Sequence, residues 1–228
     1  MDVNVFQRVE QKYLLDKNIK DLFLDKINQM VEKDPYFEST ICNIYFDNDD
    51  NELIINSLEK PTFKNKVRLR SYNVPNLDSR VYLEVKDKYK GVVGKRRCKM
   101  QLKDFYNYID NGYVKDEQIM KELDYYFNYY KLKPFIFLAY DRQSYLGKGN
   151  KNLRITFDSN LRSRKDNLRL ELGDKGNYYF DDDKYIMEIK TLGSMPLWLS
   201  RILSELKIYS ISFSKIGSIY SKERIDLC

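Results

Sequence analysis

The sequence predicts an α+β fold in which about eight antiparallel strands close into a barrel with a charged interior, while helices pack on the outside. Three observations lead to this prediction. Several segments alternate Arg, Lys or Glu with apolar residues, at the period of two that is typical of strands. Other segments carry apolar residues at helical spacing, which provides helices to cover the apolar side of a sheet. Tyr, a residue that strands favour, occurs 20 times.

The alternation of side chains places the strands. In residues 64–72, Lys66, Arg68 and Arg70 share one face of the predicted strand, and Val67 shares the other with Leu69. One such strand would fit a sheet with one face in water. The same charged residue types dominate the polar face in several further segments, and this repetition favours a common charged interior. The strands expected in chain order are 6–15, 37–47, 64–72, 80–88, 92–101, 135–146, 152–158, 167–172, 184–191 and 210–214.

Helical spacing of apolar residues places the helices. In 16–34, residues such as Ile19, Phe23 and Ile27 recur on one side, and Asp16 is the expected N-cap. Pro134 ends the helical region in the middle of the chain. The helices expected in chain order are 16–34, 49–59, 103–111, 115–131 and 195–206.

Length and composition indicate one globular domain. The chain has 228 residues, of which 43% are hydrophobic, so it can bury a core. It contains no Pro/Gly/Ser-rich linker and no internal repeat. We therefore predict a single domain over 1–228.

A barrel lined with Arg and Lys implies an anionic ligand. Cations packed side by side repel one another unless anions, carboxylates, metal ions and water neutralise them. Arg suits phosphate because its planar fork gives two parallel hydrogen bonds, while Lys acts as a point charge. Carboxylates on the predicted charged faces fit a divalent metal that bridges phosphate oxygens. These carboxylates are Glu10, Glu84, Glu171 and Glu188.

Composition also excludes several kinds of site. The sequence contains no His, which excludes Ser-His-Asp or Cys-His catalysis and any His-ligated metal. The three cysteines are far apart, so a zinc site or disulfide framework is not expected. A metal must then bind oxygen ligands, which indicates Mn²⁺ or Mg²⁺. No apolar run reaches the roughly 20 residues of a membrane span, and the start lacks a signal peptide. A cytoplasmic location is therefore expected.

Eight short motifs follow one another along nearly the whole chain. In chain order they are Arg-Val-Glu-Gln-Lys-Tyr (8–13), Lys-Val-Arg-Leu-Arg-Ser-Tyr (66–72), Leu-Glu-Val-Lys (83–86), Lys-Arg-Arg (95–97), Tyr-Asp-Arg (140–142), Arg-Ile-Thr-Phe-Asp (154–158), Met-Glu-Ile-Lys (187–190) and Phe-Ser-Lys (213–215). Taken together, they resemble the catalytic domain of the vacuolar transporter chaperone (VTC) polyphosphate polymerases. That family is grouped with the CYTH phosphatases among the triphosphate tunnel metalloenzymes.

The resemblance implies a tunnel-shaped barrel and an ATP–polyphosphate phosphotransferase. Such an enzyme moves the γ-phosphate of ATP onto a growing polyphosphate chain and releases ADP, with Mn²⁺ or Mg²⁺. By this resemblance, the catalytic phosphate-holding residues are Lys12, Arg68, Arg70, Lys86, Lys95, Arg142 and Lys215. Further substrate contacts are Arg8, Arg97, Tyr140, Arg154 and Ser214. Glu188 is the implied metal ligand, with Glu10, Glu84 and Glu171 as the other carboxylates available to the metal.

The chain departs from the family pattern at two motifs. The tunnel superfamily often begins Glu-x-Glu-x-Lys, whereas Arg8 stands at the first position here, which puts a metal contact in doubt. The closing motif often has a basic residue two positions before the Ser, where this chain has Ser212. The regulatory domain and membrane helices of eukaryotic members are also not seen, so we expect the stand-alone soluble form.

Three other functions remain open from the sequence. A triphosphatase would use the same tunnel with water as the acceptor, hydrolysing tripolyphosphate or nucleotides. A non-catalytic polyphosphate or nucleotide sensor would bind without turnover, although pure anion binding does not need the carboxylates. Nucleic-acid binding through basic strands with Tyr is the third alternative, but a net charge of +6 is small for that role.

Overall fold

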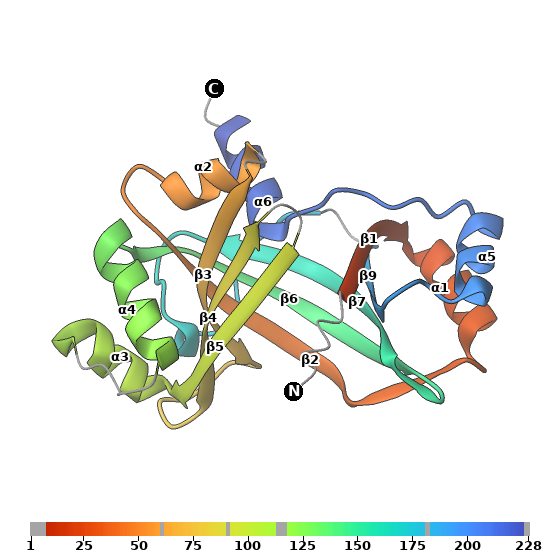
Figure 1. The fold of residues 1–228 in the computed structure, drawn as a ribbon, viewed down its shortest axis with the longest axis horizontal. Coiled ribbons are helices and arrows are strands. Elements are labelled where there is room, and N and C mark those ends of the chain that lie inside the picture. The colour runs from red at the N-terminus through yellow and green to blue at the C-terminus, as the bar shows by residue number, and fades with distance from the viewer. Residues whose placement is uncertain (1–7, 60–61, 90–91, 113–117, 181–182, 226–228) are drawn as a thin grey trace, which may run out of the picture. The chain divides into compact units, whose positions relative to one another are not determined.

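The computed structural model describes residues 8–59, 62–89, 92–112, 118–180 and 183–225 (Figure 1). These residues form an α+β structure, as predicted. The strands are β1 (Arg8–Asp16), β2 (Val31–Asp47), β3 (Phe63–Tyr72), β4 (Arg80–Tyr89), β5 (Val92–Gln101), β6 (Lys133–Gly147), β7 (Asn150–Arg164), β8 (Asn177–Tyr178) and β9 (Lys184–Leu192). The α-helices are α1 (Lys17–Ile27), α2 (Glu52–Leu58), α3 (Leu102–Asn111), α4 (Gln118–Tyr130), α5 (Leu197–Glu205) and α6 (Lys215–Ile225).

The strands join one sheet in the order β1-β9-β7-β6-β2-β3-β4-β5, with β8 paired to β7. The registers of β1 with β9, of β7 with β9, and of β3 with β2 and β4 are antiparallel. A closed barrel would require the two ends of this order, β1 and β5, to pair. Among the described residues the order shows no such pair, so the predicted closure into a barrel is not confirmed.

The chain divides into two compact units. Unit 1 comprises Met1–Ser39, Tyr140–Leu161 and Phe180–Phe213. Unit 2 comprises Thr40–Ala139, Arg162–Tyr179 and Ser214–Cys228. Each unit has its own apolar core, described below. The prediction of a single domain over 1–228 stays a prediction.

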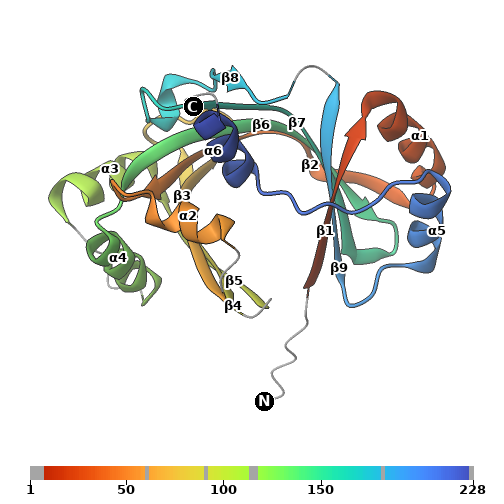
Figure 2. The ribbon, with the colours of Figure 1, turned by 90° about the horizontal axis from the view of Figure 1, so that it is seen from above.

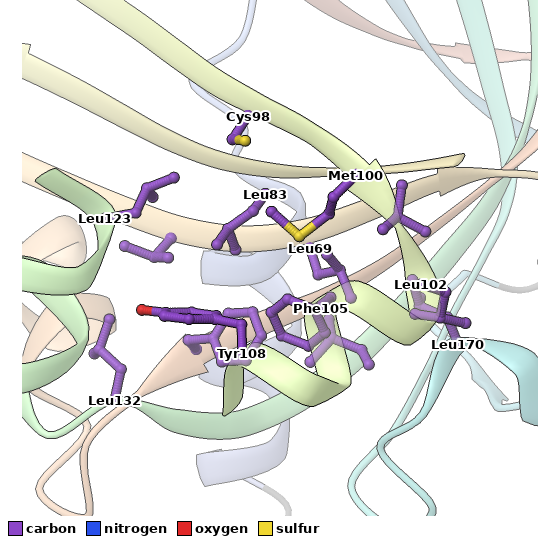
Figure 3. Packing of buried hydrophobic residues seen from close by; sticks show 14 of the residues in the cluster. Leu69, Leu83, Cys98, Met100, Leu102, Phe105, Tyr108, Leu123, Leu132 and Leu170 are labelled. Carbon is purple, nitrogen blue, oxygen red and sulfur yellow. The ribbon is translucent and has the colours of Figure 1, made fainter. Parts of the chain in front are cut away.

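The core of unit 2 lies between one face of β3, β4 and β5 and the helices α3 and α4 (Figure 3). Leu69 and Leu83 point from the strands into this core, and both are fully buried. Phe105 of α3 and Leu123 of α4 pack against the same cluster. The apolar side of the alternating strands is therefore covered by helices, as the sequence predicts.

The core of unit 1 follows the same plan. Phe157 of β7 and Met187 of β9 are buried with Phe23 of α1 and Leu199 of α5. The rings of Phe23 and Phe157 meet edge to face, with centroids 6.2 Å apart. Figure 2 shows α1 and α5 next to one another in this unit. In both units the polar side of the strands is thus left for the charged residues.

The first predicted helix is shorter than expected. α1 ends at Ile27, and residues 31–34, predicted as helical, begin β2. Val31 continues the helical spacing but is buried in the unit 1 core as part of a strand. Pairing in the sheet here overrides the local pattern, as tertiary contacts commonly do. Asp16 is the residue before α1, but its carboxylate pairs with Lys184 and makes no cap hydrogen bond.

The predicted strand at 167–172 is wrong. The segment contains a 3₁₀ helix, Leu170–Leu172. Arg164 donates hydrogen bonds to the carbonyl oxygens of Asn167 and Arg169, at 3.2 and 3.0 Å. These carbonyls are therefore bound by a guanidinium group rather than by a neighbouring strand.

The predicted strand at 210–214 is also wrong. It reduces to one bridge, between Ile211 and Lys12. Ser214 instead caps the N-terminus of the unpredicted helix α6, since its hydroxyl accepts the Gly217 N–H at 3.2 Å. Residues 6–7 and 115–117 of two predicted elements lie outside the described residues. No helix in the described ranges has the length and apolar character needed to cross a membrane.

Candidate functional site

Charged side chains form three rows across β3, β4 and β5 in unit 2. Residues directly opposite one another in an antiparallel sheet project to the same face, and here this is the face opposite the unit 2 core. The predicted alternation is therefore confirmed for these strands. From β3 to β5, the rows are Lys66, Lys86 and Lys95, then Arg68, Glu84 and Arg97, then Arg70, Tyr82 and Lys99.

Glu84 lies at the centre of these rows. We define the Arg68 cluster as Tyr45, Arg68, Arg70, Glu84 and Lys95. Arg68 donates from Nε to Glu84 Oε2 at 2.9 Å, and its Nη2 lies 2.8 Å from the same oxygen. Lys95 Nζ lies 2.7 Å from the other oxygen, Glu84 Oε1. One buried carboxylate, 1% exposed, thus orients two cations from neighbouring strands.

The charge balance of the Arg68 cluster shifts the pKa of its members. Burial would raise the pKa of Glu84, but the charges of Arg68, Arg70 and Lys95 and a hydrogen bond from Lys95 lower it to about 2. The pKa of Lys95 falls to about 8, because burial and the charges of Arg68 and Arg70 outweigh the attraction of Glu84. The cluster therefore carries more positive charge than its own carboxylate neutralises, which favours binding of an external anion.

Tyr45 on β2 belongs to the same cluster. Arg68 Nη1 donates to the Tyr45 hydroxyl at 3.1 Å. Burial would raise the pKa of Tyr45, but the charges of Arg68, Arg70 and Lys66 and this hydrogen bond lower it to about 8. Arg70 is held separately, by a hydrogen bond of 2.9 Å from its Nε to Asn43 Oδ1.

The other predicted residues of unit 2 lie around this face. Arg97 is exposed, and its guanidinium carbon lies 4.7 Å from the centre of the Tyr82 ring. Lys66 Nζ donates to the Ser214 hydroxyl at 2.8 Å, which brings the start of α6 to the lysine row. Lys215 is the first residue of α6, and Lys86 is half-buried in the lysine row.

A second group of charged residues lies in unit 1. The registers of β1, β9 and β7 align Lys12 with Glu188 and Thr156, and Glu10 with Lys190 and Arg154. These residues share the face opposite Tyr13, Met187 and Phe157 of the unit 1 core. Of the residues predicted from the sequence, Glu10, Lys12, Arg154 and Glu188 are thus placed on one polar face.

Arg142 of unit 1 is held by two hydrogen bonds to one carboxylate. We define the Arg142 cluster as Tyr140, Arg142, Asp158, Glu188 and Lys190. Arg142 donates from Nε to Asp158 Oδ1 at 2.6 Å and from Nη2 to Asp158 Oδ2 at 2.8 Å. Its guanidinium carbon lies 5.2 Å from the centre of the Tyr140 ring. Burial would lower the pKa of Arg142, but the charges of Asp158, Tyr140 and Glu188 raise it well above its usual value.

The predicted residues Lys12 and Arg154 have partners within unit 1. Lys12 Nζ donates to the carbonyl of Phe213 at 3.0 Å. Arg154 Nη2 lies 3.1 Å from Asp34 Oδ2, and its Nε donates to the Ser144 hydroxyl at 3.0 Å. For Arg8 the structure describes the backbone pairing with Leu192.

The four carboxylates proposed for the metal differ in their surroundings. Glu171 accepts hydrogen bonds from Tyr106 at 2.5 Å and from Arg169 at 2.6 Å, and it lies in the 3₁₀ helix rather than in a strand. Both oxygens of Glu84 are bound to Arg68 and Lys95. Glu171 and Glu84 are therefore committed to cationic and hydroxyl partners of the chain.

Glu188 and Glu10 also pair with cations, since Lys12 Nζ lies 3.5 Å from Glu10 Oε1, but these two carboxylates share one cation. Lys190 Nζ lies 2.8 Å from Glu188 Oε1 and 3.9 Å from Glu10 Oε2, so one cationic group already sits within reach of both carboxylates. In the part of the chain that the structure describes, no three acidic or Cys side chains gather into a metal site. Two carboxylates are nevertheless what Mg²⁺ commonly takes from a protein when substrate phosphates and water supply its other ligands.

Several residues in the two clusters or bound to them were not predicted as site residues. Tyr45 and Asn43 alternate with buried Cys42, Ile44 and Phe46, a signal that was readable in the sequence but weaker than an Arg or Lys face. Asp158 ends the motif at 154–158, but its pairing with Arg142 depends on the approach of two strands. No local sequence pattern indicates that pairing.

Comparisons with known proteins identify relatives of this chain. The model of the VTC domain matches residues 7–221. A Bacillus halodurans protein described as a "putative adenylate cyclase" is similar with a TM-score of 0.56 and 14% identity, over 91% of this chain and 95% of that chain. A Vibrio parahaemolyticus protein with the same description has a TM-score of 0.54 and 12% identity, over 94% and 98%. At these identities the likeness concerns the fold alone. No curated protein matches the chain.

Proposed function

Because this chain belongs to the VTC domain family, we propose that it is a metal-dependent phosphotransferase that moves the γ-phosphate of ATP onto inorganic polyphosphate. In this reaction a polyphosphate chain gains one phosphate unit and ATP becomes ADP. The observation that carries the proposal is the cationic face of β3, β4 and β5, in which one buried carboxylate serves several cations. A cytoplasmic location, where ATP is available, is part of the proposal.

The proposed chemistry suits the residues of both clusters. Phosphoryl transfer depends mainly on positioning and on stabilisation of the negative charge of the transition state. Arg68 and Lys95 are oriented by Glu84 before any ligand binds, so little reorganisation is needed when phosphates arrive. The acceptor is a terminal phosphate that is already largely ionised at neutral pH, and therefore it needs no strong general base.

Further positively charged residues complete the proposed binding set. We propose that the Arg68 cluster, which includes Arg70, holds phosphates together with Lys86 and Lys215. In unit 1, Lys12 and Arg142 are proposed to hold phosphates. Arg8, Arg97, Tyr140, Arg154 and Ser214 are proposed as additional substrate contacts. A bound Mn²⁺ or Mg²⁺ would neutralise donor phosphate oxygens, and Glu188 with Glu10 would hold it.

The direct test is an assay of the purified protein with ATP and Mn²⁺ or Mg²⁺. We expect release of ADP and lengthening of polyphosphate, and gel electrophoresis measures the length of the polymer. Arg68→Gln should lower the rate roughly 100-fold, the scale of losing one transition-state contact. Arg201→Gln, which removes an exposed Arg of α5, is the control and should leave the rate unchanged. Absence of both polymer and orthophosphate would refute an enzymatic function.

The same assay distinguishes the hydrolytic alternative. A triphosphatase would release orthophosphate from tripolyphosphate or ATP without forming longer chains. Product length therefore decides between transfer to phosphate and transfer to water. Binding of polyphosphate without any product would instead indicate a non-catalytic binding module.

A further inference from the structure

A cavity of about 1080 Å³ lies in unit 2, apart from the residues of the Arg68 cluster. Four cations line it: Arg164, Lys165, Lys175 and Lys222. Among the described lining residues Asp166 is the one carboxylate, and it accepts a hydrogen bond from Asn167. The cavity is therefore a positively charged site whose residues take no part in the function proposed above.

One wall of this cavity is a loop that two arginines hold in place. Arg164 donates from Nη1 to the carbonyls of Gly173 and Lys175, at 3.0 and 2.7 Å. Its guanidinium carbon lies 3.6 Å from the centre of the Phe137 ring. Arg162, which is buried, donates from Nε to the carbonyl of Asp174 at 2.7 Å. These bonds fix the backbone that carries Lys165 and Lys175, so the two lysines are already positioned at the cavity before a ligand binds.

Helix α6 forms another part of the wall. Ile219 and Lys222 of α6 line the cavity, and Lys222 Nζ donates to the carbonyl of Tyr179 at 3.0 Å. Figure 2 shows α6 near β8, in agreement with this bond. Ser214 precedes the first residue of α6 at its other end and accepts the hydrogen bond from Lys66 of the lysine row. From Lys215 to Lys222 the helix rises by about 10 Å.

We propose that this cavity is a second binding site for a phosphate chain, as found in inorganic polyphosphate or in the triphosphate of a nucleotide. Lysines act as point charges and accept a chain in several registers, unlike the directional fork of Arg. The volume is of the size that ligand sites occupy. Tyr178 lines the cavity and is 62% exposed, so its ring is available to a nucleobase if the ligand is a nucleotide. The site requires binding only, and it does not depend on turnover.

The test is the stoichiometry of tripolyphosphate binding by calorimetry, with EDTA present to prevent turnover. We expect the wild-type protein to bind two molecules of tripolyphosphate. Lys165→Gln with Lys175→Gln should weaken the binding of one of these equivalents about tenfold or more. Arg68→Gln should weaken the binding of the other. The control is Lys148→Gln with Lys151→Gln, which removes the same charge at two exposed lysines, one in the turn between β6 and β7 and one at the start of β7. It should leave both equivalents unchanged.

Parallel titrations with ATP and AMP identify the source of the phosphate chain. Equal binding of ATP and tripolyphosphate at the cavity indicates an inorganic chain. Tighter binding of ATP, lost on Tyr178→Ala, indicates a nucleotide. A single equivalent in the wild type, or two equivalents of unchanged affinity in the Lys165 and Lys175 variant, overturns the second site. Circular dichroism and the thermal midpoint verify that the variants are folded. If the assay of the purified protein finds no turnover, the second equivalent is still measurable, so the two proposals fail separately.

Discussion

Replacing Glu84 by Gln tests how the Arg68 cluster is held together. Glu84 is 1% exposed, and its two oxygens lie 2.8 Å from Arg68 and 2.7 Å from Lys95. Gln keeps the shape of the side chain but removes the negative charge that both cations face. Removing one partner of a buried ion pair costs roughly 3–5 kcal/mol in the free energy of unfolding.

The lowered pKa of Glu84 gives a second estimate of this loss in the free energy of unfolding. It is lowered from 4.5 to about 2, against the effect of burial, by Arg68, Arg70 and Lys95. A difference of this size corresponds to about 3 kcal/mol of stabilisation. Since the folded-state pKa is depressed, this contribution is fully present above pH 4.5 and is lost as the pH falls from there toward 2.

Urea unfolding followed by circular dichroism measures the effect. We expect Glu84→Gln to lower the free energy of unfolding by about 3 kcal/mol at neutral pH, with a smaller difference from wild type below the unfolded-state pKa. The control is Glu205→Gln, because Glu205 pairs with Lys26 at 2.7 Å but is 61% exposed. An exposed pair contributes only about 0–1 kcal/mol. Equal losses for the two variants, or a Glu84 effect independent of pH, would refute this account of the cluster.

Three further predictions concern charge, metal and packing. Because the pKa of Lys95 is about 8, affinity for tripolyphosphate should fall as the pH rises through 8, and Lys95→Arg should remove this loss in a pH titration. Glu188→Gln should abolish turnover with Mn²⁺ while polyphosphate binding persists, and retention of full activity would exclude Glu188 as the metal ligand. Gly176→Ala should destabilise the fold by about 1–3 kcal/mol in urea unfolding, because the added Cβ would lie 2.5 Å from the carbonyl oxygen of Ser163. An unchanged midpoint would contradict that close approach.

The strands of unit 2 were predictable because charged residues alternate with apolar residues along each of them. Lys66, Arg68 and Arg70 alternate with Val67 and Leu69, and period-two alternation has one structural solution when the apolar side is buried. The rows across β3, β4 and β5 follow from that alternation once the strands pair. The sequence could therefore indicate a common cationic face without any knowledge of distances.

The errors arose where short-range hydrogen bonds from side chains to the backbone override the apolar pattern. Leu168, Leu170 and Leu172 alternate like a strand, but Arg164 binds two carbonyls of the segment, and a 3₁₀ helix forms. α6 has no strong apolar stripe to indicate a helix, and its start depends on the cap at Ser214. These hydrogen bonds join residues three to five positions apart, but the pattern of apolar residues gives no sign of them.

The pairings of the cations change how phosphate binding should be understood. From sequence alone, Arg142 would be expected to offer its fork to phosphate, yet its Nε and Nη2 are bonded to Asp158. Arg68 is likewise oriented by Glu84 and donates a further bond to Tyr45. A phosphate oxygen would then meet guanidinium groups whose rotamers are already fixed, and the remaining donors and the net positive charge would bind it. A buried carboxylate beside a cation lowers the net charge of the site. However, it also removes the entropy cost of ordering a long side chain when the ligand binds. A phosphate chain is so highly charged that attraction to the cations is already strong. The orientation of the cations then limits binding more than their charge does, and the carboxylates of the protein provide that orientation.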